Sequence, residues 1–141
     1  MMMKDREKKN FINKSQIKRL KDSGVSLVYL FGSYAEGKSL PLSDIDVGVI
    51  FTDESKMKED IGRIYNGLYD IFTDVFPGRN IDIVFLQNAP LELRFDAVSH
   101  GKILYESTRE ERLDFEEKTT LFYADFKPIL EEINQVILNR V

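Results

Sequence analysis

Cysteine is absent from the sequence, and no stretch of it is both long and uniformly apolar. The lack of cysteine excludes a disulfide framework and a thiolate zinc site, and it fits a reducing cytoplasm. No apolar run approaches the roughly 20 residues that a membrane-spanning helix needs. The N-terminal stretch MMMKDREKKN also lacks the apolar core of a signal peptide. We therefore expect a cytoplasmic protein without a membrane span.

Acidic residues outnumber basic ones, so the formal net charge is −4. This argues against a protein that binds nucleic acid through bulk positive charge. The remaining composition, with 43% apolar and 31% charged residues, is that of an ordinary globular protein. The 141 residues suit a single domain, with a core over about residues 20–106 and a helical segment over about 109–140.

Four short stretches rich in β-branched and aromatic residues predict strands, and they alternate with segments of helical periodicity. The predicted strands cover residues 25–31, 44–51, 81–86 and 102–105. Helices are predicted with a cap at Ser15, from Met57 to Val75, from a cap at Asn88 and first position at Pro90 to Gly101, and from Arg109 onward. The interleaved strands and helices predict an α+β domain.

Two aspartates open the second predicted strand, and a third interrupts the next one. Because side chains alternate along a strand, Asp44 and Asp46 project from the same face. Asp82 breaks the apolar run IDIVFL, and it joins them if the two strands are neighbours. Grouped acids on a buried face are costly unless a cation lies between them, and hard oxygen ligands select Mg²⁺ or Mn²⁺. Three such carboxylates can hold two metal ions, an arrangement that serves phosphoryl and nucleotidyl transfer.

A glycine and a serine, Gly32 and Ser33, follow the first predicted strand directly. Glycine lets the backbone and its N–H groups approach a ligand, and the serine hydroxyl adds a donor. The P-loop lysine is missing, so this would be a phosphate cradle of another kind, suited to a nucleoside triphosphate beside the acids. Each feature alone has a plainer interpretation: a simple turn, a surface or Ca²⁺-binding pair at Asp44 and Asp46, and a solvent-facing acid at Asp82.

The segments FGSYAEG, LSDIDVGVIF and NIDIVFL resemble the nucleotidyltransferases of the DNA polymerase β superfamily, whose pattern is G-S-x₁₀-D-x-D plus a distal aspartate. The small size and the ending SHGKILYES resemble the minimal nucleotidyltransferases (MNT) of prokaryotes. Many of these are antitoxins paired with an all-helical HEPN ribonuclease toxin. The likeness implies a palm-like fold, a mixed sheet flanked by helices, and Mg²⁺-dependent transfer of a nucleoside monophosphate from a triphosphate.

The resemblance also implies a role for each residue that matches the pattern. The pair Gly32-Ser33 would bind the triphosphate of ATP, and Ser43 would orient the metal ligands. Asp44 and Asp46 would hold the Mg²⁺ ions, of which two are expected, with Mn²⁺ as a substitute. Asp82 would be the third acidic ligand, near the attacking hydroxyl.

Three functions follow from this resemblance. The first is transfer of AMP from ATP to a tyrosine of a partner HEPN toxin, which makes the protein an antitoxin. The second is the same chemistry on a small hydroxyl compound such as an aminoglycoside, although larger members with that activity carry an extra substrate domain. The third is an antitoxin that acts by binding only. Three grouped carboxylates argue against it, because their mutual repulsion costs stability and binding alone would not require them. One departure is Glu36, which stands where relatives often have arginine.

The predicted C-terminal helix has more apolar residues than a single stripe requires. A helix packed only on its own domain needs an apolar stripe of about 100°. We expect the surplus to meet another chain, either a second copy in a homo-oligomer or the helical toxin. The alternative is that Pro128, which should kink or split this helix, lets both halves fold back onto the sheet.

Overall fold

The structure, a computed structural model, describes residues 11–37 and 44–139 and is built around a four-stranded mixed sheet. Its strands are β1 (Val25–Phe31), β2 (Ile45–Phe51), β3 (Ile81–Phe85) and β4 (Lys102–Glu106), arranged in the order β3-β2-β1-β4. Strand β1 runs antiparallel to β2 and β4, whereas β3 runs parallel to β2. The predicted α+β class is confirmed, and each strand lies within one residue of its predicted bounds.

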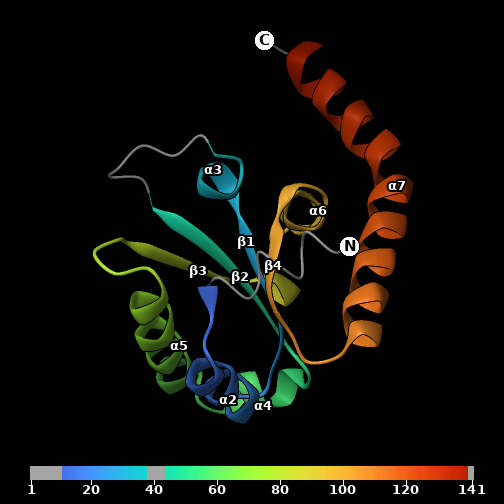
Figure 1. The fold of residues 1–141 in the computed structure, drawn as a ribbon. Helices are drawn as coiled ribbons and strands as arrows, with labels where there is room; N and C mark the ends of the chain where they lie inside the picture. Colours follow the sequence, from blue (N-terminus) through green and yellow to red (C-terminus); the bar gives the residue numbers. More distant parts are fainter. Residues whose placement is uncertain (1–10, 38–43, 140–141) are drawn as a thin grey trace.

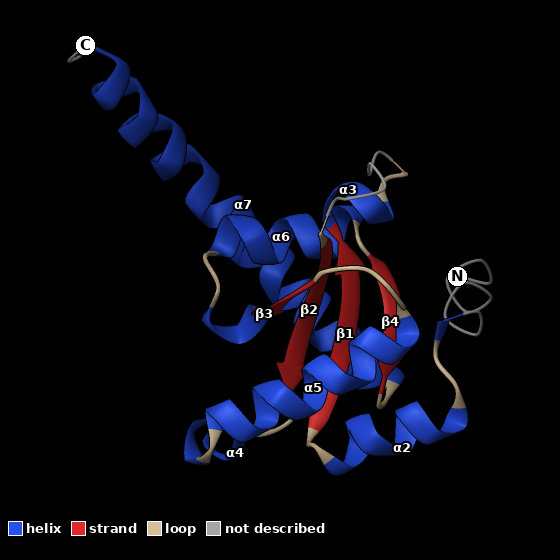
Figure 2. Ribbon diagram, turned by 90° about the vertical axis from the view of Figure 1, so that its left-hand side faces the viewer, coloured by secondary structure: helices blue, strands red, loops and turns tan. Residues whose placement is uncertain are grey.

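Helices cover both faces of the sheet (Figures 1 and 2). One face carries α2 (Lys14–Asp22), α4 (Glu54–Glu59) and α5 (Ile61–Val75), and the other carries α6 (Leu91–His100) and α7 (Arg109–Asn139). Two short pieces remain, the helix α3 (Gly32–Ala35) and a 3₁₀ turn (Leu86–Asn88). None of the helices in the described ranges is both long and apolar enough to cross a membrane.

The two cores explain why β1 is apolar at every position except Ser26. Val28 and Leu30 belong to the core under α2 and α5, whereas Leu27 and Tyr29 belong to the core under α6. All seven residues of β1 are buried. A central strand that is covered on both faces has no solvent-facing positions, so its sequence does not alternate between apolar and polar residues.

Three helix boundaries differ from the sequence-based expectation. Asn13, rather than Ser15, caps α2, because its side chain and that of Gln16 each accept a hydrogen bond from the other's backbone N–H. The predicted helix from Met57 to Val75 is broken at Asp60, whose side chain accepts from the N–H of Arg63 and starts α5. Pro90 takes the capping position of α6 instead of the first helical position, and Asn88 lies in the 3₁₀ turn.

Helix α7 runs through Pro128 without a break, so of the expected kink or split the split is wrong. Proline removes the N–H that would bond the carbonyl of Ala124, and both residues are exposed, so water can satisfy that carbonyl. The C-terminal half of α7 does not fold back onto the sheet. It projects beyond the domain at the end of the sheet that carries α3 (Figures 1 and 2).

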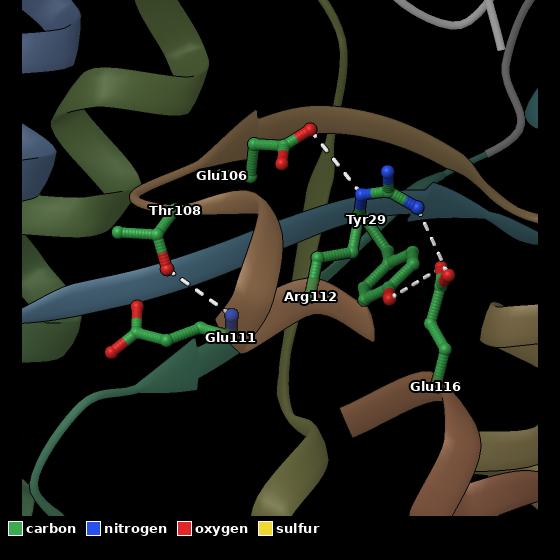
Figure 3. A network of polar contacts seen from close by, with 6 residues as sticks. All are labelled: Tyr29, Glu106, Thr108, Glu111, Arg112 and Glu116. Carbon is green, nitrogen blue, oxygen red and sulfur yellow. Dashed lines mark hydrogen bonds and ion pairs between the residues drawn. The ribbon is translucent and has the colours of Figure 1, made fainter. Parts of the chain in front are cut away.

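The first half of α7 is held on the sheet by a buried polar network (Figure 3). The Arg112 guanidinium donates from Nε to Glu106 on β4 over 3.3 Å and from Nη1 to Glu116 over 3.0 Å. The Tyr29 hydroxyl on β1 donates to the other oxygen of Glu116 over 2.9 Å. Burial, followed by the negative charge of Glu116, raises the pKa of Tyr29 well above its usual range. Tyr29 therefore stays protonated and acts as a donor.

Candidate active site

Strand register brings the candidate residues to one end of the sheet. In the antiparallel pair, Phe31, the last residue of β1, lies opposite Asp46. In the parallel pair, Asp46 lies directly beside Asp82. The chain then continues from Phe31 into Gly32 and α3, so the glycine follows β1 at the same end where the acids stand. The condition set by the sequence, that the second and third strands be neighbours, is met.

Asp46 and Asp82 also share a face of the sheet. The residues next to Asp46, Ile45 and Val47, are buried in the core under α2 and α5, so Asp46 points to the opposite face. Asp82 is flanked in the same way by residues of that core. Asp46 is half-buried, whereas Asp44 and Asp82 are exposed, which leaves this acidic group open to a ligand.

Gly32 is required by the geometry of this site. Its φ of +74° is a conformation that side-chain-bearing residues rarely adopt. A Cβ atom at this position would overlap Oδ2 of Asp46 and lie 3.1 Å from its Cγ. Sequence reasoning expected the glycine to let the backbone approach a ligand, and the structure shows that it also lets the backbone approach the Asp46 carboxylate. Ser33 follows in the first turn of α3 and is half-buried.

The electrostatics of the acidic group favour an added positive charge. Burial, followed by the neighbouring charges of Asp82 and Asp44 and a hydrogen bond with Asp82, raises the pKa of Asp46 above its usual value. The carboxylates therefore repel one another when all are ionised. A proton or a cation relieves that repulsion. Hard carboxylate oxygens with this crowding fit Mg²⁺ or Mn²⁺.

The carboxylates alone do not complete a metal site. Within the described ranges, no three or more His, Cys, Asp or Glu side chains are arranged so that they could hold a metal ion by themselves. Mg²⁺ commonly takes one or two protein carboxylates and completes its coordination with water and substrate phosphates. Asp44, Asp46 and Asp82 therefore fit a metal that binds together with a phosphate-bearing ligand. Ser43, which was predicted to orient the metal ligands, lies outside the described residues.

The junction between α6 and β4 borders the same end of the sheet. Lys102, the first residue of β4, pairs with Leu30, and a Cβ on Gly101 would lie 3.0 Å from the Leu30 carbonyl oxygen. This pairing places the cationic Lys102 beside the last-but-one residue of β1, and sequence analysis did not single it out. No local pattern marks it, because only the pairing of β4 with β1 places it there. His100 ends α6 and its ring nitrogen lies 3.1 Å from Asp96.

Comparison with known proteins finds several that are similar to this chain in sequence and in fold. Over 125 residues the chain is 28% identical to the protein adenylyltransferase MntA of Shewanella oneidensis, an alignment that covers 83% of this chain and 84% of that protein. A crystal structure of a toxin–antitoxin with AMP-PNP is 26% identical, with a TM-score of 0.57 over 86% of this chain and 98% of that one. A crystal structure of the toxin–antitoxin MntA–HepT is also 26% identical, with a TM-score of 0.55 over 84% and 93% of the two chains.

The family itself is established by a broader match. Residues 14–110 match the model of the polymerase β nucleotidyltransferase family, and this stretch includes the whole sheet and all three aspartates. The resemblance noted in the sequence is thereby confirmed. This chain belongs to the polymerase β nucleotidyltransferase family.

Proposed function

We propose that this chain transfers the AMP moiety of ATP to a hydroxyl group, that of a tyrosine on a partner HEPN toxin, and so acts as an antitoxin. The observation that carries the proposal is the position of Asp46, which lies against Gly32 on one side and beside Asp82 on the other. Similarity to a protein adenylyltransferase and to chains crystallised as toxin–antitoxins supports the choice of acceptor.

Each residue of the site has a task in this reaction. Asp44 and Asp46 would hold Mg²⁺ jointly with ATP, and the bound metal supplies charge neutralisation at the reacting phosphate. The N–H groups and hydroxyl of Gly32-Ser33 would hold the terminal phosphates. Asp82, which is exposed, would orient the acceptor hydroxyl and take its proton. The hydroxyl oxygen forms a bond to the α-phosphorus, and pyrophosphate leaves.

The reaction is tested with ATP that carries its label on either the α- or the γ-phosphate. The protein and Mg²⁺ would be incubated with a candidate HEPN toxin and each form of ATP, and label on the toxin would be measured. Transfer of the α-label without the γ-label is expected. Label from the γ-phosphate alone would mean phosphoryl transfer. Acceptance by an aminoglycoside but by no protein would assign a small-molecule substrate, and neutralisation without either label would assign an antitoxin that acts by binding only.

The metal is tested by calorimetric titration of ATP with and without Mg²⁺. We expect Mg²⁺ and ATP to strengthen each other's binding, because the phosphate oxygens complete the coordination that the carboxylates begin. Asp44→Asn should weaken this coupled binding strongly. Equal ATP affinity in the wild type and the variant would refute the assignment of Asp44 as a metal ligand.

A further inference from the structure

An apolar stripe on α7 continues past the point where the helix leaves its own domain. The stripe follows positions spaced alternately three and four residues apart, the repeat of a helix that packs along another helix. These positions are Arg112, Phe115, Thr119, Phe122, Phe126, Ile129, Ile133 and Val136, all apolar except Arg112 and Thr119. The first three pack on the domain, and Thr119 is only 2% exposed. The last five, which we call the seam, are each about half exposed, from 49% at Val136 to 54% at Phe122.

At the inner end of the seam, α6 and α7 border a cavity of about 380 Å³. Its walls are largely apolar and include Leu91, Phe122, Phe126 and Leu130. Arg94 of α6 also lines this cavity, and its Nε is buried without a hydrogen-bond partner in the described structure. Glu92 also lines the cavity, and an occupant that brings a carboxylate to the Arg94 guanidinium would form a charge-assisted hydrogen bond with it.

The side of the seam that faces away from α6 is acidic. Tyr123 stacks on Phe95 of α6 at a ring separation of 3.9 Å, which marks the side of the stripe that faces α6. Asp125 and Glu132, one heptad apart and both exposed, lie on the other side. Charges at such flanking positions select the partner in paired helices. A helix that lies along the seam should therefore carry lysine or arginine opposite them.

A second copy of α7 does not meet these requirements. In an antiparallel pair, equivalent flanking positions face each other, so the acidic residues Asp125 and Glu132 of the two copies would repel. In a parallel pair, the two domains would lie at the same end of the helices. They would crowd each other there, because in each copy the first half of α7 already packs on its own domain (Figure 1). A different protein therefore suits the seam better than a second copy.

We propose that the seam and the adjoining cavity bind an amphipathic helix of a partner protein. That helix has apolar residues at heptad spacing, Lys or Arg facing Asp125 and Glu132, and a carboxylate that reaches Arg94. The seam projects at the end of the sheet that carries α3, so a partner bound there lies on the same side of the domain as Asp46 and Asp82 (Figures 1 and 2). The proposal goes beyond nucleotidyl transfer and holds whether or not the partner is modified.

The test uses two labelled, designed helical peptides of about three heptads with Leu and Ile at the apolar positions. One has lysine flanks and a single glutamate at one end, and the other has every charge reversed. Fluorescence anisotropy should show that the wild type binds the lysine-flanked peptide about fivefold more tightly, the scale of two exposed ion pairs. The double substitution Asp125→Lys and Glu132→Lys should reverse this preference. Equal binding of both peptides by the wild type would contradict the proposed charge pattern.

Matched substitutions locate the surface. Ile133→Glu places a charge on the seam and should weaken binding of the lysine-flanked peptide at least about tenfold. Leu138→Glu changes an apolar residue of the same helix that is 67% exposed and off the stripe, so binding should persist. Changing the peptide glutamate to glutamine should weaken binding to the wild type but not to Arg94→Met. Unchanged binding by Ile133→Glu would exclude the seam as the binding surface.

The competing occupant is tested by sedimentation. The wild type should remain monomeric at micromolar concentrations, and a dimer that Ile133→Glu abolishes would overturn the proposal in favour of a second copy. Mg²⁺-dependent ATP binding by the Ile133→Glu protein should equal that of the wild type, because the substituted side chain is remote from the acids. That measurement shows that the variant is folded, and it also separates failure of the docking surface from failure of the nucleotide site.

Discussion

Two polar clusters stand on the same face of the sheet, and they differ in how their charges are balanced. In the cluster around Arg112, the guanidinium contacts both Glu106 and Glu116, and Tyr29 donates to Glu116. In the cluster around Asp46, carboxylates adjoin carboxylates, and the neighbouring charges of Asp82 and Asp44 both raise the pKa of Asp46. In the first cluster the charges are paired within the fold, whereas in the second the repulsion between carboxylates favours an added proton or cation.

This difference separates a structural role from a functional one. Buried charges that are paired and hydrogen-bonded make the folded state costly to disrupt, because loss of one partner leaves another charge uncompensated. Like charges held together lower stability instead, and a chain retains them where the repulsion is relieved by a ligand. We therefore expect substitutions in the two clusters to have opposite effects on stability and on ligand binding.

The largest effect on stability is expected at Arg112. Arg112→Met removes the cation of the structural cluster and should destabilise the protein by about 3 kcal/mol, because Glu106 and Glu116 lose their buried partner. Urea unfolding measures this loss. Arg19→Met is the matched control, because Arg19 is 43% exposed and lies 3.7 Å from Asp74, and its loss should cost less than about 0.5 kcal/mol. Mg²⁺-dependent ATP affinity should be normal in the folded fraction of both variants.

The largest effect on activity is expected at Asp82. Asp82→Asn should lower the rate of AMP transfer at least about 100-fold, because the acid acts on the attacking hydroxyl in the transition state. Its ATP affinity should stay close to that of the wild type. Single-turnover transfer and calorimetry measure the two quantities separately. A near-normal rate would show that Asp82 is an exposed strand residue with no role in catalysis.

A smaller effect is expected at Gly32, and Gly78 provides the matched control. Both glycines have a φ of +74°, but a Cβ at Gly78 meets no atom within 4 Å, whereas one at Gly32 overlaps the Asp46 carboxylate. Gly78→Ala should therefore cost about 1 kcal/mol for its backbone conformation alone. Gly32→Ala should cost at least about 1 kcal/mol more and should also weaken ATP binding. Equal losses in the two variants would show that the contact with Asp46 is unimportant.

Much of the site could be predicted because its signals are local in sequence. The largely apolar stretch VSLVYLF predicts a buried strand, and the spacing from Gly32-Ser33 to Asp44 and Asp46 does not depend on tertiary packing. The apolar surroundings of Asp82 marked it as part of a strand, but the sequence left open whether that strand lies beside the one that carries Asp46. The register that places it directly beside Asp46 became visible only in the structure.

Other features could not be predicted, because two physical tendencies competed or because the cause lies elsewhere in the chain. Apolar periodicity favoured one helix from Met57 to Val75, but Asp60 caps a new helix there, and Ile61 is left 49% exposed. The positions of Lys102 and Arg94 depend on strand pairing and on helix packing, which no local pattern reveals. The surplus of apolar residues on α7, by contrast, was expected from the sequence, and within the described residues those from Phe122 to Val136 along the stripe are about half exposed.

The contrast between the clusters is tested most directly at Asp46. The raised pKa of its carboxyl means that the folded protein binds a proton more tightly there than the unfolded chain does. Ionised Asp46 therefore lowers stability as pH rises through its folded pKa. At neutral pH, Asp46→Asn should raise the melting temperature of the ligand-free protein by a few degrees, and this difference from the wild type should shrink as pH falls toward about 4.

The decisive measurement is the melting temperature of wild type and Asp46→Asn, each with and without Mg²⁺ and ATP. The wild type should melt at a lower temperature than the variant without ligand, and it should gain stability when Mg²⁺ and ATP are added together. The variant should gain little, because it has lost a carboxylate that the metal requires. A variant that is less stable than the wild type without ligand, and that still gains the full increase with Mg²⁺ and ATP, would show that Asp46 is a structural residue and would contradict a metal-dependent nucleotidyl transfer site at this end of the sheet.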